Sequence, residues 1–176
     1  MVRALALGLV ALTLFPVAVC AHGPSRQKVT ETVEINAPPE KVWKVIGNFQ
    51  DMSWHPAIAK TEGQGGNDAN ATRTLTLKSG GTIAEKLDAY DAAKMLYKYE
   101  ITDVDVKVLP VKNYSSSLSV KGDGGKSTVE WKGAFYRGFM NNEPPPELNE
   151  EAAIKAVTGV YRSGLDALKQ KLEAGG

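Results

Sequence analysis

Apolar and polar residues alternate along most of this chain, which is the pattern of β-strands with one buried face. The alternation is cleanest at residues 95–101, and glycine-rich turns at residues 79–81 and 122–125 separate neighbouring segments. About seven strands are predicted, at residues 28–35, 58–62, 72–78, 82–87, 95–101, 113–121 and 127–137.

Three other segments predict helices. Residues 36–40 begin a short helix with prolines in its first turn, and Gly47 ends it. The compact aromatic segment Phe49 to His55 predicts a second short helix, which Pro56 ends. Residues 150–172 carry one apolar stripe at helical spacing. The stripe consists of Ile154, Val157, Tyr161, Leu165, Leu168 and Leu172.

This order of elements predicts an α+β fold in one domain, residues 28–173. An antiparallel sheet of this length must cover its apolar face, and the C-terminal helix is the only long amphipathic partner. We therefore expect a curved sheet wrapped around that helix, with a cavity between the two.

The first 21 residues predict a secretory signal peptide. Arg3 is the only charge before an apolar run at residues 4–15, and small residues precede a cleavage site after Ala21. The run is shorter than the roughly 20 residues that span a bilayer. Lipidation at Cys20 is the less favoured alternative, because Val19 is larger than lipoprotein cleavage normally accepts. We expect a mature domain that functions in the periplasm.

Composition excludes several kinds of site. Cleavage removes Arg3 and no acidic residue, so the mature chain is formally neutral, which argues against nucleic-acid binding. Its single cysteine, Cys20, lies within the signal peptide, and only two histidines are present, too few for a usual zinc site. Neither a phosphate-binding glycine loop nor a Gly-x-Ser-x-Gly motif occurs. We expect no metal and no cofactor.

The segments Val33–Trp43, Ile46–Phe49 and Trp54–Pro56 resemble the START-like (SRPBCC) superfamily, which includes polyketide cyclase-like proteins. This resemblance implies the helix-grip fold. Residues Asp51–Ala57 and the proline-rich loop Phe139–Glu147, together with the export signal, are similar to the MxaD-type periplasmic proteins of methanol-oxidation clusters. That similarity implies methanol dehydrogenase and its cytochrome c as partners.

Glu85 shares a strand face with Ile83 and Leu87, so its carboxylate is expected to point inward. It either pairs with Arg73 on the neighbouring strand or anchors a ligand in the cavity. Trp54 and His55 are expected at the cavity mouth. They either cap the core, with His55 bonded to backbone, or contact a ligand or partner.

Two further groups are candidates. Inward-facing aromatic residues are expected to form the core first and to line the cavity second. They are Tyr97, Tyr99, Tyr114, Trp131 and Phe135. Acidic residues in and after the proline-rich loop are either solvated or form a partner-docking site. They are Glu143, Glu147, Glu150 and Glu151.

Three functions remain open, and no residue is predicted to be catalytic. The leading hypothesis is a non-enzymatic periplasmic accessory protein that assists electron transfer between methanol dehydrogenase and its cytochrome c. The second is a protein that binds or carries a small apolar ligand in the helix-grip cavity. The third is a polyketide cyclase-like enzyme that uses Glu85, His55 and a tyrosine hydroxyl as acid and base.

Overall fold

The structure is a computed structural model that describes residues 23–174, so the predicted signal peptide, residues 1–21, lies outside the described residues. In chain order the elements are β1 (Gln27–Ile35), α1 (Pro39–Ile46), β2 (Ile58–Gln64), β3 (Thr72–Leu77), β4 (Thr82–Asp91), β5 (Leu96–Val104), β6 (Val111–Asp123), β7 (Lys126–Arg137), the 3₁₀ helix η1 (Pro146–Leu148) and α2 (Glu150–Glu173).

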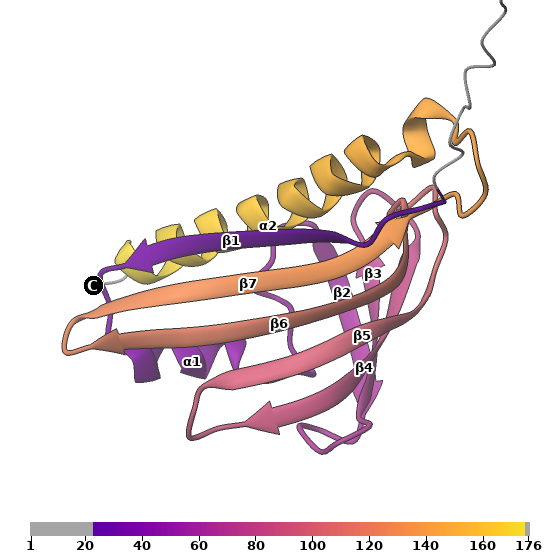
Figure 1. Ribbon diagram of the computed structural model, residues 1–176. Coiled ribbons are helices and arrows are strands. Elements are labelled where there is room, and N and C mark those ends of the chain that lie inside the picture. Colours follow the sequence, from indigo (N-terminus) through magenta and orange to yellow (C-terminus); the bar gives the residue numbers. More distant parts are fainter. Residues whose placement is uncertain (1–22, 175–176) are drawn as a thin grey trace, which may run out of the picture.

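All seven strands form one antiparallel sheet in the order β1-β7-β6-β5-β4-β3-β2. β1 and β2 are the two edges, so α1 and the segment after it cross from one edge to the other. Irregular pairing in β4–β5 and β6–β7 bends the strands, and the sheet curves around α2 (Figure 1). The predicted α+β helix-grip architecture is confirmed.

α1 begins where the sequence predicts, with Pro39 in its first turn, and ends before Gly47, whose N–H donates to the Trp43 carbonyl. Val42 and Ile46 are fully buried, whereas Trp43 is half-buried and packs on Tyr90 and Tyr97. The helix therefore closes one end of the core.

The predicted second short helix at residues 49–55 is wrong, because this segment forms turns. Asn48 Oδ1 accepts from the N–H of Gln50, and Asp51 Oδ1 accepts from the N–H of Ser53. Such bonds from a side chain to the backbone two residues later compete with helical bonding. The aromatic residues in this segment are buried nonetheless, so the apolar pattern reported burial and not helical structure.

α2 covers the concave face of the sheet and packs mainly on β1 and β7. Its N-cap is Asn149, whose side chain accepts from the Ala152 N–H at 2.8 Å. The predicted stripe is buried from Val157 onward, but Ile154 is 36% exposed. Ala153 takes the buried position instead, because it lies four residues before Val157 and so continues the same face.

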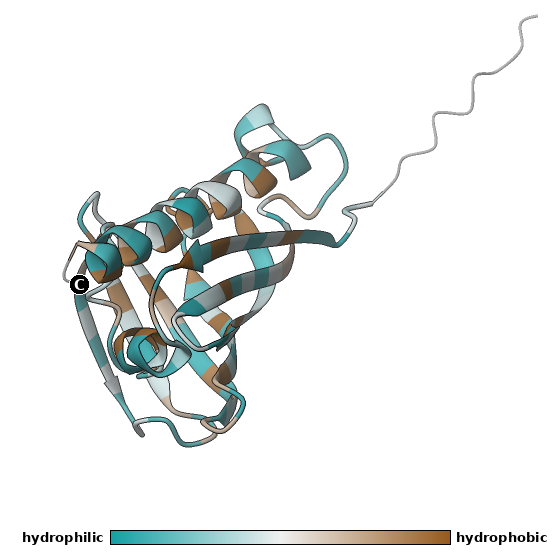
Figure 2. Ribbon diagram, turned by 90° about the vertical axis from the view of Figure 1, so that its left-hand side faces the viewer, coloured by the Kyte–Doolittle hydropathy of each residue, from teal (hydrophilic) through white to brown (hydrophobic). Residues whose placement is uncertain are grey.

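The core lies between the sheet and the two α-helices, and the apolar residues of α2 face it (Figure 2). Within residues 23–174, no helix has the length and hydropathy needed to cross a membrane.

Leu165 tests this packing, because its side chain is fully buried between α2 and the sheet. We expect Leu165→Ala to lower the free energy of unfolding by about 2–5 kcal/mol, since it leaves a cavity. The exposed Gln170→Ala on the same helix should change it by less than about 0.5 kcal/mol. Urea unfolding of both variants measures the difference, and equal losses would show that the stripe is not the buried face.

Candidate functional site

A cavity of about 180 Å³ lies inside the curved sheet. β3, β4 and β5 form one wall, and the segment around Val108 and the middle of α2 close it. Most of the lining is apolar, with side chains such as Leu75, Ile83, Ile101 and Val160. The polar groups in the wall are therefore few.

Glu85 and Arg73 form a buried ion pair beside this cavity. They lie directly opposite each other on β4 and β3, and Arg73 Nε donates to Glu85 Oε2 at 2.6 Å. Arg73 Nη1 also donates to the Phe49 carbonyl at 2.7 Å, and the guanidinium carbon lies 4.1 Å from the Phe49 ring centroid. The predicted inward direction of Glu85 and its pairing with Arg73 are confirmed.

The pair is held in a strongly desolvated environment. Burial raises the pKa of Glu85, and the Arg73 guanidinium opposes that rise. For Arg73, burial alone would lower the pKa, but the Glu85 carboxylate together with Tyr97 and Tyr99 outweighs burial and raises it. Removing one partner would leave the other charge buried without compensation, which is strongly destabilising.

His55 has both ring nitrogens engaged by backbone. Its Nε2 lies 3.0 Å from the Val160 carbonyl oxygen of α2, and the Ala57 N–H donates to Nδ1 at 3.2 Å. These partners require the neutral tautomer with the proton on Nε2. Gly164 permits this contact, because a Cβ there would lie 2.5 Å from His55 Cδ2. The backbone bonding expected for His55 in one of its two alternatives is thus observed, and the side chain also lines the cavity.

A network of hydrogen bonds joins the aromatic residues of the wall. Trp131 Nε1 donates to the Tyr99 hydroxyl at 3.0 Å and to Ser116 Oγ at 3.1 Å. The Tyr114 and Tyr161 hydroxyls are also hydrogen-bonded to each other. The sequence showed Tyr161 only as part of an apolar stripe, and it gave no signal for Ser116. Their roles depend on the contact between α2 and the sheet.

The predicted aromatic candidates divide into two groups. Tyr99, Tyr114 and Trp131 line the cavity together with His55 and Glu85. The others pack in the core beside it: Trp54 against Trp131, Tyr97 against Phe49 and Phe135 against Tyr114.

Burial and backbone partners determine the protonation of the polar groups in the wall. Burial raises the pKa of Tyr99 and that of Tyr114 well above the ordinary value, so both hydroxyls stay protonated at neutral pH. His55 has no free nitrogen to act as a base. Among residues 23–174, no group of three or more His, Cys, Asp or Glu side chains could hold a metal ion.

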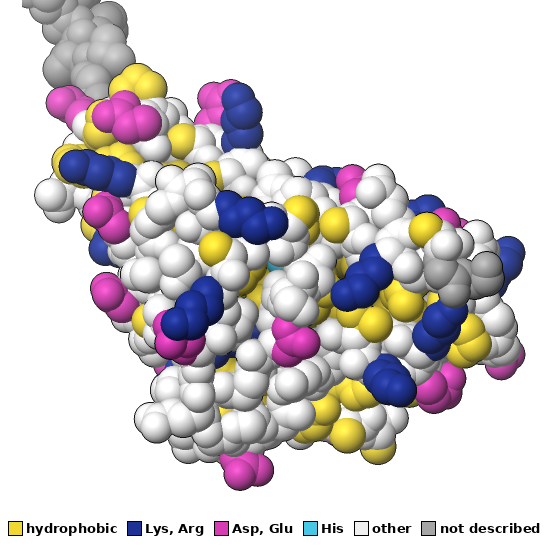
Figure 3. Space-filling view, turned by 180° about the vertical axis from the view of Figure 1, so that it is seen from behind, with side chains coloured by type: hydrophobic (Ala, Val, Ile, Leu, Met, Phe, Trp, Pro, Cys, Tyr) yellow, Lys and Arg dark blue, Asp and Glu magenta, His cyan; other side chains and the backbone are white. Residues whose placement is uncertain are grey.

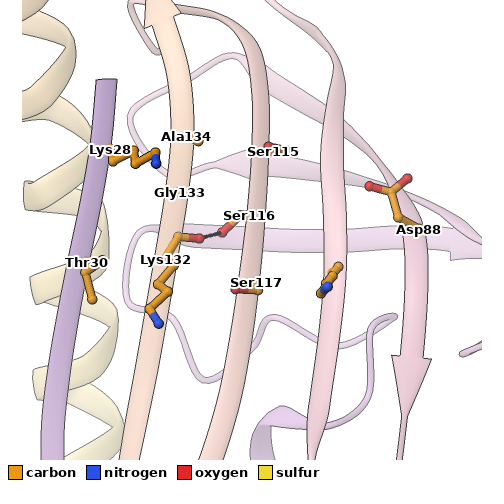
Figure 4. A pocket seen from close by; sticks show the side chains of 10 residues that line it. Lys28, Thr30, Asp88, Ser115, Ser116, Ser117, Lys132, Gly133 and Ala134 are labelled. Atoms are coloured by element: carbon orange, nitrogen blue, oxygen red, sulfur yellow. Dashed lines mark hydrogen bonds between the residues drawn. The ribbon is translucent and has the colours of Figure 1, made fainter. Parts of the chain in front are cut away.

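A second, more open depression of about 300 Å³ lies on the outer face of the sheet (Figure 4). Lys28, Lys98 and Lys132 surround a floor of small residues that includes Ser117. Lys132 is paired with Glu130 at 2.7 Å. Exposed lysines on an open surface can attract anions weakly, but this depression lacks the buried, oriented polar groups of a specific small-molecule site.

The acidic candidates differ among themselves. Glu143, Glu147 and Glu151 are exposed, whereas Glu150 is half-buried and both of its carboxylate oxygens accept from Arg137 Nη1, at 2.7 and 2.8 Å. The Arg137 guanidinium lowers the pKa of Glu150. Glu150 therefore holds the start of α2 on the sheet, and the three exposed residues are the ones placed to meet a partner.

The face opposite to that seen in Figure 1 carries side chains of both charges. On the face seen in Figure 3, basic and acidic side chains are interspersed among apolar ones. Such a face is not the clustered basic surface that nucleic-acid binding requires.

A family model described as polyketide cyclase / dehydrase and lipid transport matches residues 26–173. The chain belongs to this family. The START-like resemblance of the sequence is thereby confirmed.

Several solved structures share this fold. The protein XoxI from Bacillus cereus is 33% identical, with a TM-score of 0.69, and the match covers 83% of this chain and 95% of that one. A protein from Nitrosospira multiformis is 26% identical, with a TM-score of 0.67, covering 83% and 96%. Norcoclaurine synthase from Thalictrum flavum, at 15% identity and a TM-score of 0.64 over 96% and 98%, shares the fold alone. A comparison with curated proteins found no match.

His55 predicts a pH dependence of stability. Burial lowers its pKa below the ordinary value of 6.5, and the bond to Val160 opposes this only in part. The unfolded chain therefore binds this proton more readily than the folded chain does. The contribution of His55 to the free energy of unfolding is fully present above pH 6.5. It decreases as the pH drops below 6.5, by at most about 1.4 kcal/mol per pH unit. His55→Gln should flatten urea-unfolding free energies between pH 5 and 6.5, and an unchanged slope would assign the dependence to another group.

Proposed function

We propose that this protein is a non-enzymatic binding protein that holds one small, mainly apolar molecule in the cavity beside Glu85. The observation that carries the proposal is the cavity itself, about 180 Å³ of largely apolar space with one buried carboxylate in its wall. Ligand sites of this kind combine an apolar lining with a few placed polar groups. The signal peptide expected from the sequence supports placing this role in the periplasm.

The side chains around the cavity support binding without turnover. Acid–base catalysis by Glu85, His55 and a tyrosine hydroxyl would need a group free to take up a proton at neutral pH. Both nitrogens of His55 are bonded to backbone groups, which leaves Glu85 Oε1 as the one acceptor of this set without a partner among the described residues. The cyclase-like alternative therefore has the weaker support.

Toluene is a suitable probe, because an engineered cavity of about 150 Å³ binds benzene. We expect toluene to bind the protein with one-to-one stoichiometry in isothermal titration calorimetry. Leu75→Phe should abolish this binding, since Leu75 lines the cavity and the larger ring would fill it. Thr74→Phe is the matched control, because Thr74 precedes Leu75 on β3 and faces outward. Toluene that binds neither wild type nor control would refute the proposal.

A second candidate function is assistance to a redox partner pair, methanol dehydrogenase and its cytochrome c, as the MxaD-type resemblance implies. The observation that favours it is the composition of the surface around η1. Glu143, Glu147 and Glu151 are exposed there together with Met140 and Ile154, the two large apolar side chains that are most exposed within residues 23–174. Acidic residues around apolar ones suit a transient, electrostatically steered contact.

Cytochrome reduction by purified methanol dehydrogenase tests this role. The protein should raise the rate at low salt, and the effect should shrink as salt rises, because exposed charges are screened within about 8 Å at physiological ionic strength. Replacing Glu143, Glu147 and Glu151 with Gln should mimic high salt. Replacing the exposed acids Glu34, Glu40 and Asp123 with Asn or Gln is the charge-matched control. A rate that does not respond to the protein at low salt would exclude this role.

A further inference from the structure

The polar atoms in the cavity wall restrict which ligand can bind. Most of them already have partners within the protein. The two nitrogens of His55 bond to backbone, Trp131 Nε1 donates to two oxygens, and the Tyr114 hydroxyl bonds to that of Tyr161. A buried polar group that is already satisfied gains little from a ligand. Among the buried side chains of the lining, the remaining capacity lies at Glu85 and Tyr99, whereas Ser79 is exposed. Two buried nitrogens outside the lining, Arg73 Nη2 and Trp54 Nε1, also have no partner among the described residues.

Glu85 presents a free acceptor. Arg73 donates to its Oε2, and no described residue donates to its Oε1. The side chain is only 5% exposed and lines the cavity, so water has little access to it. A carboxylate oxygen in such a place is costly to leave unbonded. A ligand group with a proton to donate would compensate for that cost.

The Tyr99 hydroxyl, on the strand next to that of Glu85, has a proton free to donate. The Tyr99 oxygen accepts from Trp131 Nε1, and none of the described residues accepts its hydroxyl proton. The strand register places Leu87, two residues after Glu85 on β4, opposite Tyr99 on β5. The two side chains thus offer one acceptor and one donor on the same wall, which matches a hydroxyl group, since a hydroxyl both donates and accepts.

The charge and the volume of the cavity further restrict the class of ligand. Arg73 already compensates the charge of Glu85, so a cationic ligand would bring an uncompensated charge into an apolar cavity. An anion would face the carboxylate directly. The volume of about 180 Å³ slightly exceeds the 150 Å³ that accommodates benzene, which leaves space for one or two further heavy atoms.

We propose that the cavity recognises a neutral alcohol about the size of one ring, a phenol or a small cyclic alcohol, whose hydroxyl donates to Glu85 and accepts from Tyr99. This inference rests on the proposed cavity-binding function and specifies its ligand class.

The test compares p-cresol with toluene, which has the same ring and methyl group but no hydroxyl. We expect p-cresol to bind wild-type protein at least about ten-fold more tightly, because hydrogen bonds to charged groups are the stronger kind. Benzylammonium and benzoate should bind more weakly than p-cresol. Isothermal titration calorimetry measures all four dissociation constants.

Two variants test whether Glu85 and Tyr99 cause the preference for p-cresol over toluene. Tyr99→Phe keeps the ion pair and should reduce the ratio of toluene to p-cresol dissociation constants several-fold, because the variant removes a hydrogen bond that only p-cresol can accept. Glu85→Gln should reduce the ratio as well, and retained toluene binding shows that the variant is folded. If Glu85→Gln does not fold, Tyr99→Phe decides alone.

The outcomes separate the two proposals. Equal affinity for toluene and p-cresol overturns the ligand class and leaves the cavity-binding function standing. Tighter binding of benzylammonium than of p-cresol also overturns it, since the site would then select a cation. A ratio that neither variant changes overturns the assignment to Glu85 and Tyr99. Failure of every probe to bind overturns the proposed function itself.

Discussion

The close approach of α2 to the sheet is the constraint on which the other features depend. The rings of Trp131 and Tyr161 stack with centroids 4.4 Å apart and planes 12° from parallel. Two glycines make this distance possible, because a Cβ at Gly133 would collide with the Tyr161 hydroxyl and one at Gly164 would collide with His55. Trp131 also lines the cavity, so this stack forms part of the boundary of the space that remains.

The buried ion pair is the feature that packing alone does not explain. Taking two charges out of water costs several kcal/mol per ion, and apolar side chains of similar size often give equal stability. Here Arg73 also bonds the Phe49 carbonyl, so it fixes the segment that crosses between the sheet edges. The same bonds hold Glu85 rigidly in the cavity wall. An acceptor held rigidly in this way is preorganised for a ligand that enters the cavity.

Much of this arrangement could be predicted from the sequence, because it depends on local periodicity. A period of two determines which strand residues face inward, and a tight turn between β3 and β4 brings neighbouring residues into register. These two facts sufficed to predict that Glu85 points inward and to give Arg73 as one of its two possible partners, the other being a ligand. The long helix and its stripe followed from the period of 3.6. The error at residues 49–55 arose because apolar spacing reports burial even where side chains of Asn and Asp hold the backbone in turns.

What the sequence determined by itself was the set of strands, the face that each buries and the family of the fold. Only the tertiary structure decided how closely α2 approaches the sheet, and thereby the cavity volume, the bonding of both His55 nitrogens and the pairing of Tyr161 with Tyr114. It also separated Glu150, bound to Arg137, from its exposed acidic neighbours. The physical reason is that these contacts join residues far apart in the chain, so their geometry follows from the packing of whole elements, which no local pattern records.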